Sequence, residues 1–236
     1  MSPSGEPQSG RSDGRNAPPL HLRRGLAFEV IPSTFEENLP KERFPTPELY
    51  VLENAKQKAL EVLRRVTSAA TEQQQTTPLL VIGCDTVVVL DGVILEKPKD
   101  EDDAFAVLTK LSGRAHDVFS GVALLTTTAG GGERLHPFFE KTSVVFGPLE
   151  PQDIRAYIAT GEPMDKAGSY GLQGRTDLAC FGLKEATARA NASNVNATGR
   201  ARCFVRELHG CTNNVIGFPV QRFCQELKAL AAKDEL

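Results

Sequence analysis

Residues 79–98 read LLVIGCDTVVVLDGVILEKP, and this stretch decides the fold. Its first apolar run turns abruptly acidic at Asp85, which is typical of a buried strand whose carboxyl end delivers a charge to a surface crevice. The dipeptide Asp91-Gly92 lies between two further apolar runs and tolerates the positive φ angles of a two-residue turn, so it predicts a β-hairpin. The hairpin would fold Lys97 back toward Asp85.

The pattern outside this stretch alternates between helices and strands. Thr46 and Pro47 supply a cap residue and a first-turn proline, and apolar residues then recur every three or four positions. The further patterns predict helices over 47–66, 100–111, 151–159 and 219–232 and strands over 118–126, 138–146 and 203–208. The alternation predicts an α/β fold with a mixed, twisted sheet flanked by helices, since the hairpin requires at least one antiparallel pair.

Composition limits the class of protein. The chain has 236 residues, 40% apolar and 24% charged, which suits one large globular domain or two small ones. The net charge of −3 argues against a nucleic-acid coat, and the apolar runs are far shorter than the roughly 20 residues of a membrane span. The five cysteines contain no C-x-x-C pair, so a reducing compartment, and hence the cytoplasm, is the expected location.

The two ends of the chain are expected to be tails around one domain. Residues 1–19 contain four Ser, three Gly and four Pro, a composition that cannot offset the entropy of ordering, and no apolar segment of a secretory signal. The last four residues, 233–236, form a retention signal that acts only in a lumen, so its occurrence here is interpreted as a coincidence. The expected domain therefore spans residues 20–232.

Three clusters of residues could carry chemistry. Asp85 at a strand end could hold a divalent cation or accept a proton from water, with Lys97 near enough to bind a phosphate; the alternative is a turn-forming Asp-Thr pair. The glycine-rich residues 161–174 would allow close approach to a ligand, or form only a flexible loop. Residues 209–219 turn into the last helix and could face an anion, although a helix-capping loop is the favoured interpretation.

Together these stretches resemble the Maf family of nucleoside triphosphate pyrophosphatases, which is related in fold to the inosine triphosphate pyrophosphatases. The resemblance covers about residues 26–228 and is closest to the Maf-like domain of acetylserotonin O-methyltransferase-like proteins. It rests on motifs that occur in the family's order: Phe28-Glu-Val, Phe35-Glu-Glu37, Ala55-Lys-Gln-Lys58-Ala59, Gly83-Cys-Asp85-Thr86, Asp91 to Pro98, Leu111 to Val118, Asp165 to Gly174 and Asn214 to Pro219. The pattern G-x-x-x-x-G-K-[ST] of a P-loop does not occur.

The resemblance implies hydrolysis of dTTP, UTP or modified pyrimidine nucleotides between the α and β phosphates, giving the monophosphate and pyrophosphate. By this resemblance Asp85 accepts a proton from water and, with Glu37, binds Mg²⁺ or Mn²⁺. Lys58 and Lys97 would bind phosphate oxygens, and Thr86 and Gln173 would discriminate the base. The implied partners are the nucleotide and a second copy of the chain in a homodimer, without nucleic acid or membrane.

Two departures from the family's pattern leave an alternative open. The family begins with a strand and a Ser-x-Ser-Pro-Arg-Arg loop, whereas here only Arg23 and Arg24 stand before Phe28, so we expect an amino-terminus truncated or altered where the family grips the triphosphate. Residues 175–202 form an expected insertion beside Gln173. The alternative function is therefore a catalytically impaired nucleotide-binding or dimerisation module, in which Arg23 and Arg24 replace the loop only if the tail folds back.

Overall fold

The computed structural model describes residues 28–69, 78–128, 132–173 and 200–233. The chain divides into two units, Met1–Pro32 and Ser33–Leu236, and all the described helices and strands belong to the second. The described residues of the first unit, 28–32, form neither helix nor strand. The expectations for the tail 1–19, for Arg23 and Arg24, and for most of the insertion lie outside the described residues.

Each helix and strand predicted from the sequence is present, but the prediction that Asp85 and Thr86 lie at a strand end is wrong, because the apolar runs on both sides of them form the single strand Leu80–Leu90. The helices are α1 (Pro47–Ala69), α3 (Glu101–Leu111), α4 (Pro151–Ile158), α6 (Thr212–Ile216) and α7 (Val220–Ala232), with 3-10 turns η2 (Lys41–Arg43), η3 (Glu162–Asp165), η4 (Ala167–Ser169) and η7 (Arg200–Phe204). The strands are β1 (Leu80–Leu90), β2 (Val93–Leu95), β3 (Ala115–Thr127), β4 (Glu133–Phe146) and β5 (Val205–His209). Of the described helices, none combines the length and apolar character needed to cross a membrane.

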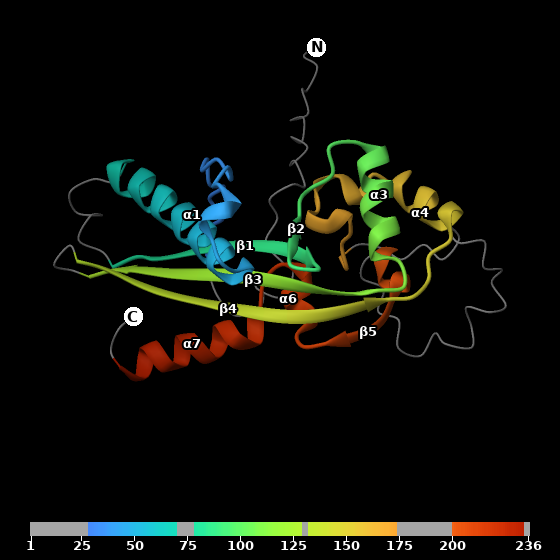
Figure 1. The fold of residues 1–236 in the computed structure, drawn as a ribbon. Coiled ribbons are helices and arrows are strands. Elements are labelled where there is room, and N and C mark those ends of the chain that lie inside the picture. Colours follow the sequence, from blue (N-terminus) through green and yellow to red (C-terminus); the bar gives the residue numbers. More distant parts are fainter. Residues whose placement is uncertain (1–27, 70–77, 129–131, 174–199, 234–236) are drawn as a thin grey trace, which may run out of the picture. The chain divides into compact units, whose positions relative to one another are not determined.

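The α/β fold is confirmed, but its sheet differs from the mixed sheet expected. The strands lie in the order β2-β1-β3-β4-β5, and every described pair is antiparallel (Figure 1). Helix α3 carries the chain from β2 to β3 on the other side of β1, so β2 and β3 run in the same direction, but each pairs with β1 and not with the other. The hairpin at Asp91 and Gly92 is confirmed, with φ angles of 52° and 78°.

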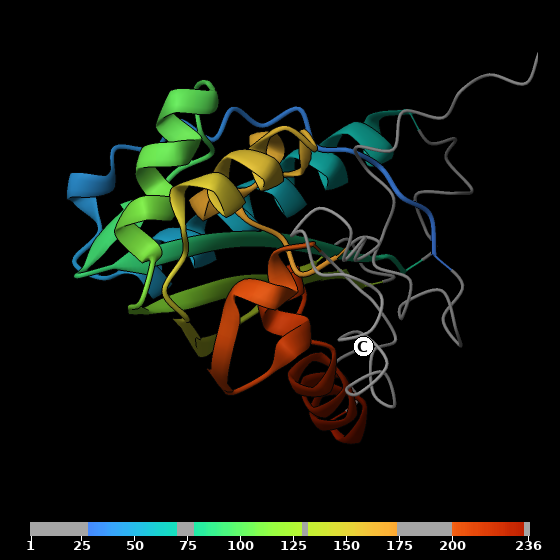
Figure 2. The same cartoon turned by 90° about the vertical axis from the view of Figure 1, so that its right-hand side faces the viewer.

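Alternate residues of β1 face two different sets of helices. Val87 and Val89 pack with the first turn of α1, whereas Val88 and Leu90 belong to the core under α3 and α4. Figures 1 and 2 show α1 on one side of the sheet and α7 on the other. The carboxyl half of β1 is therefore buried on both faces.

Helix α1 approaches the sheet so closely that two positions must be glycine. A Cβ atom on Gly83 would lie 2.0 Å from the carbonyl oxygen of Ala55, and one on Gly121 would lie 2.5 Å from the backbone of Val51. Gly83 is on β1, and Gly121 is on β3, paired with Asp85. Because neither glycine has a side chain, α1 can lie this close to the sheet beside Asp85.

The first half of β1 is less buried than the sequence predicts. Leu80 and Ile82 are 41% and 40% exposed, although they belong to the apolar run that predicts a buried strand. Leu79 and Val81 pack against the apolar face of α1, whereas Leu80 and Ile82, which alternate with them, point to the opposite face of the sheet and remain exposed. An apolar run indicates a strand, but it does not show whether both faces of that strand will be covered.

A histidine lies in the core between the sheet and the glycine-rich segment. His116 on β3 is 3% exposed, and its Nε2 atom is 2.8 Å from the hydroxyl of Tyr170. Its ring also packs edge-on against Phe146. Burial lowers the pKa of His116 to about 4, because the imidazolium form would lose its hydration in this environment.

The close approach of α1 yields a prediction for stability. Gly83→Ala should lower the free energy of unfolding by about 3 kcal/mol, because the new methyl group overlaps the backbone of α1. Denaturant unfolding measures this change. Gly147→Ala is the matched control, since the nearest atom to its Cβ is 3.9 Å away, and it should change stability by less than about 1 kcal/mol. Equal effects in the two variants would contradict the packing described.

The buried histidine yields a prediction for pH. The pKa of His116 is about 4 in the folded protein and about 6.5 when the chain is unfolded, so the unfolded state binds more protons between these values. The free energy of unfolding should therefore fall by on the order of 3 kcal/mol as the pH drops from 6.5 to 4. His116→Gln should lose less over the same interval. An equal loss in urea titrations of both proteins would assign the acid sensitivity to other groups.

Candidate active site

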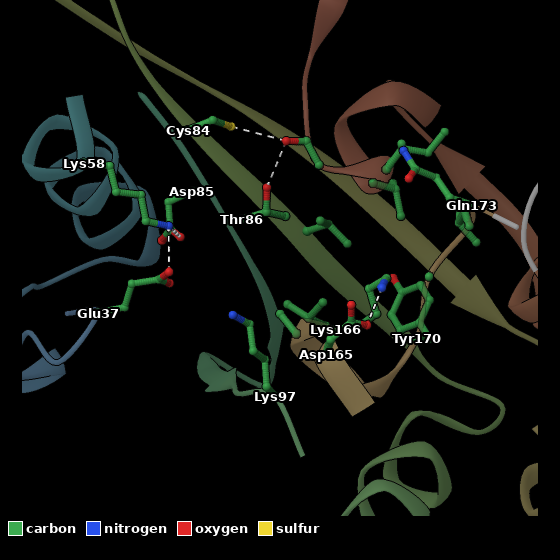
Figure 3. A pocket seen from close by; sticks show the side chains of 18 residues that line it. Glu37, Lys58, Cys84, Asp85, Thr86, Lys97, Asp165, Lys166, Tyr170 and Gln173 are labelled. Atoms are coloured by element: carbon green, nitrogen blue, oxygen red, sulfur yellow. Dashed lines mark hydrogen bonds and ion pairs between the residues drawn. The ribbon is translucent and has the colours of Figure 1, made fainter. Parts of the chain in front are cut away.

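The predicted acid Asp85 lies at the centre of a charged cluster. Its side chain is on the face of β1 that packs against α1, and the residue is 8% exposed. The ammonium of Lys58 on α1 donates to Asp85 Oδ1 at 2.7 Å and lies 3.0 Å from Glu37 Oε1 (Figure 3). The structure thus brings together three residues from separate parts of the sequence.

The three charges of this cluster shift one another's proton affinity. Burial raises the pKa of Asp85, and Glu37 adds to this effect, while Lys58 opposes it without cancelling it. Burial also acts to raise the pKa of Glu37, but Lys58 outweighs it and the pKa is lowered. Asp85 is therefore the stronger proton acceptor of the two carboxylates. The pKa of Lys58 is raised, because the two carboxylates outweigh the burial that would lower it, so Lys58 carries its charge.

Lys97 lies across from the cluster and is differently placed. The hairpin returns it to the neighbourhood of Asp85, as predicted, and the two side chains line the same cavities. Lys58 is held by two carboxylates, whereas Lys97 makes no ion pair or hydrogen bond with the described side chains (Figure 3). Its charge still reaches Glu37, since it contributes to the lowered pKa of that carboxyl group. Lys97 is thus a cation available to a ligand.

Two adjoining cavities meet at Asp85. The first has a volume of about 280 Å³ and the second about 310 Å³, and both are lined by Glu37, Asp85, Thr86, Lys97 and Ala167. The first continues over the face of the sheet away from α1, past Tyr170, Leu172, Gln173, Ile216 and Gly217. The second continues on the α1 side, past Lys41, Tyr50, Ile94 and Glu96. The cavities can meet because β2 pairs with β1 only from Val88 onward.

Thr86 is anchored rather than free. Its hydroxyl is 2.8 Å from the hydroxyl of Ser120 and donates to the carbonyl of Gly217 at 3.3 Å. Asn214, fully buried on α6, donates its amide to the carbonyl of Val118 and to the hydroxyl of Thr142, both at 3.0 Å. These bonds fasten α6 and the following turn to the sheet as the floor of the first cavity.

Sequence reasoning did not find the supports of that floor. The sequence favours a helix-capping loop over residues 209–219 that takes part only in positioning the site, and it assigns no role to Ser120. A signal was present in each case: Ser120 interrupts an apolar strand, and two adjacent asparagines precede the apolar end of α6. Buried polar groups of this kind need partners, and here they find them across the chain.

Some of the remaining predicted site residues lie within the described part of the chain, and others do not. Gln173 lines the first cavity at the end of a described segment and is exposed. Tyr170 forms a wall of the same cavity and is held by His116. Arg23 and Arg24 lie outside the described residues.

The carboxylate oxygens of this cluster can be compared with the ligands that a divalent cation requires. Glu37 and Asp85 present carboxylate oxygens to the same point, and with Lys58 the cluster carries a net charge of about −1. Within the described ranges, no group of three acidic, histidine or cysteine side chains forms a closed cage. Mg²⁺ is usually bound by one or two carboxylates together with substrate phosphates and water. The two carboxylates fit that mode of binding.

Comparison with known proteins places the chain among its relatives. Residues 19–182 match the family model described as Maf-like protein. The chain is 38% identical to a dTTP/UTP pyrophosphatase of Agathobacter rectalis, over 87% of this chain and 88% of that protein. A dTTP/UTP pyrophosphatase of Clostridium perfringens is 37% identical, over 85% of each.

A human relative is longer than this chain. It is named probable bifunctional dTTP/UTP pyrophosphatase/methyltransferase protein, and the two are 41% identical over 209 residues, which are 87% of this chain but only 29% of the human protein. The family match, the bacterial relatives that the chain covers almost fully and the motifs gathered around Asp85 agree. The chain belongs to the Maf family.

Proposed function

We propose that the chain is a nucleoside triphosphate pyrophosphatase that hydrolyses dTTP, UTP and modified pyrimidine nucleotides to the monophosphate and pyrophosphate. The observation that carries this proposal is the cluster of Asp85, Lys58 and Glu37 opposite Lys97, which has no ion-pair partner among the described residues. The names of the bacterial relatives, dTTP/UTP pyrophosphatase, support the same reaction.

The chemistry of the two cavities suggests how the substrate would lie. The first is lined by the buried Tyr170 and Leu172 and by the exposed amide of Gln173, a combination that suits a base and a sugar. The second contains the cations Lys41 and Lys97 beside carboxylates, which suits phosphates that arrive with a metal ion. The bond to be broken would then lie where the cavities meet, beside Asp85.

In the proposed mechanism Asp85 is the general base. A water molecule held by its carboxylate gives up a proton to it as the water oxygen bonds to phosphorus, and the bridging oxygen leaves with pyrophosphate. Its raised pKa makes Asp85 a better proton acceptor than an exposed aspartate would be. Lys58 holds the carboxylate in place through the 2.7 Å contact, so the base does not have to be ordered during the reaction.

Lys97 would bind the phosphates and Glu37 would share the metal. Lys97 brings a positive charge to phosphate oxygens that become more negative as the anhydride bond breaks. Glu37 and Asp85 would hold Mg²⁺ or Mn²⁺, which when bound offsets charge on the phosphates and on departing pyrophosphate. Lys58 keeps the two carboxylates together when that charge is absent.

The proposal also includes predictions from the sequence that the described residues do not test. The pyrophosphatase domain would span residues 20–232, with Thr86 and Gln173 discriminating the base and Arg23 and Arg24 near the phosphates only if the tail folds back. We also propose a cytoplasmic location and a homodimer. Thr86 would act by the position of its side chain, since its hydroxyl is already bonded to Ser120 and Gly217.

Asp85→Asn tests the proposed reaction. Pyrophosphate release from dTTP or UTP with Mg²⁺ should fall at least about 100-fold, because the amide cannot accept the proton. The melting temperature should stay nearly unchanged or rise, since an unfavourably buried charge is removed. Asp91→Asn is the matched control in the exposed turn and should retain full activity.

The same experiment distinguishes the alternative function. If the unmodified protein releases no pyrophosphate while dTTP or UTP still raises its melting temperature, the chain is a nucleotide-binding module and not an enzyme. If Asp85→Asn keeps half of the activity, Asp85 is not the general base.

Lys97→Ala tests the proposed phosphate contact. The variant should raise KM and lower kcat together, with kcat/KM reduced about 10-fold to 100-fold, because the charge acts on bound substrate and on the transition state. Steady-state kinetics with dTTP measure both constants. Lys99→Ala removes a lysine two positions away that lines neither cavity, and it should behave as the unmodified protein. Equal kinetics in both variants would remove Lys97 from the site.

A further inference from the structure

The segment that carries Glu37 has no regular structure, yet it is attached firmly to α1. Residues 33–39 form neither helix nor strand. One carboxylate, that of Glu61, accepts hydrogen bonds from the Ser33 hydroxyl at 2.8 Å, the Thr34 amide at 3.0 Å and the Thr34 hydroxyl at 2.9 Å. The Ser33 hydroxyl in turn accepts from the amide of Phe35 at 3.1 Å. The Glu61 side chain thus provides the hydrogen-bond acceptors for Ser33 and Thr34 at the start of the segment.

Glu61 is well suited to this role. It accepts all three bonds from Ser33 and Thr34, and Arg65, one turn further along α1, donates to it at 2.9 Å. Hydrogen bonds to an ionised carboxylate are stronger than those between neutral groups. Burial acts to raise the pKa of Glu61, but the bonds from Thr34, Ser33 and Arg65 outweigh it and lower the pKa to about 2. The carboxylate is therefore ionised at neutral pH.

The second attachment of the segment is the metal-binding carboxylate itself. Glu37 lies 3.0 Å from Lys58 on the same helix. Lys58 precedes Glu61 by three residues, which is less than one helical turn and a rise of about 4.5 Å. An extended chain covers at most about 3.6 Å per residue, so fixing Thr34 confines the backbone of Glu37 to within about 11 Å. Both ends of the segment are therefore held by one helix.

We propose that Glu61 is a positioning residue, which holds the segment 33–37 on α1 so that the Glu37 carboxylate stays beside Asp85 and ready for the divalent cation. This inference rests on the proposed function, because it assigns Glu61 an effect through Glu37. Glu61 itself touches neither cavity, so it is not a catalytic residue. The role was not apparent from the sequence, where Glu61 is one of many charges on an exposed helix face.

Glu61→Ala is the variant that tests the role. It should raise the Mg²⁺ concentration for half-maximal pyrophosphate release about 10-fold or more, the size of effect expected when a partner that orients a metal ligand is lost. Hydrogen–deuterium exchange of amides 33–38, measured without nucleotide or metal, should become faster. Glu61→Gln keeps one acceptor oxygen and should fall between the two proteins. Glu53→Ala removes a carboxylate of α1 whose bonds within the described residues are to its neighbours Lys56 and Gln57, so it is the control and should change neither quantity.

A double-mutant cycle separates positioning from a general loss of stability. In a Glu37→Gln background, Glu61→Ala should have little further effect on the Mg²⁺ requirement, because the two changes act through the same carboxylate. Additive effects in the cycle, or unchanged exchange of amides 33–38, would overturn the inference. If the unmodified protein releases no pyrophosphate, the proposed function fails first, and the exchange measurement still decides whether Glu61 holds the segment.

Discussion

The site depends on the contact between α1 and the sheet at Gly83 and Gly121. Any side chain at these positions would push the helix outward, since a Cβ atom would lie 2.0 Å and 2.5 Å from backbone atoms of α1. Lys58 projects from this helix and reaches Asp85, two residues beyond Gly83, at 2.7 Å. An outward shift of the helix would break this ion pair and leave a buried carboxylate without its partner, which is costly. The close packing of α1 on the sheet is therefore also a requirement of the proposed catalytic site.

The charged cluster is formed by residues from three separate parts of the chain. Asp85 belongs to the sheet, Lys58 to the helix and Glu37 to a segment without regular structure. Two carboxylates around one ammonium leave a net negative charge, and Lys97 stands opposite without a described partner. Such an arrangement suits a ligand that brings both a divalent cation and phosphates. The Glu61 contacts explain how the irregular segment can join a site that otherwise stands on rigid elements.

The short strand β2 gives the site access to both faces of the sheet. It pairs with the end of β1 only, so the described sheet has an edge at Asp85 and Thr86, whose side chains point to opposite faces. One cavity extends toward α6 and Tyr170, and the other toward the start of α1. A nucleotide could therefore place its base and its phosphates in different environments while its anhydride bond lies beside Asp85, the proposed general base.

The sequence by itself determined the elements and the chemistry of the central motif. Apolar residues spaced three or four apart predicted the helices, and continuous apolar runs predicted the strands. The Asp91-Gly92 turn predicted the return of Lys97, because these signals act within a few residues. Tertiary structure alone decided the antiparallel pairing throughout the described sheet, the exposure of Leu80, the buried bonds of Asn214 and the attachment of residues 33–37 by Glu61. These features join residues far apart in the chain, and a local pattern carries no information about which distant partner satisfies a polar group.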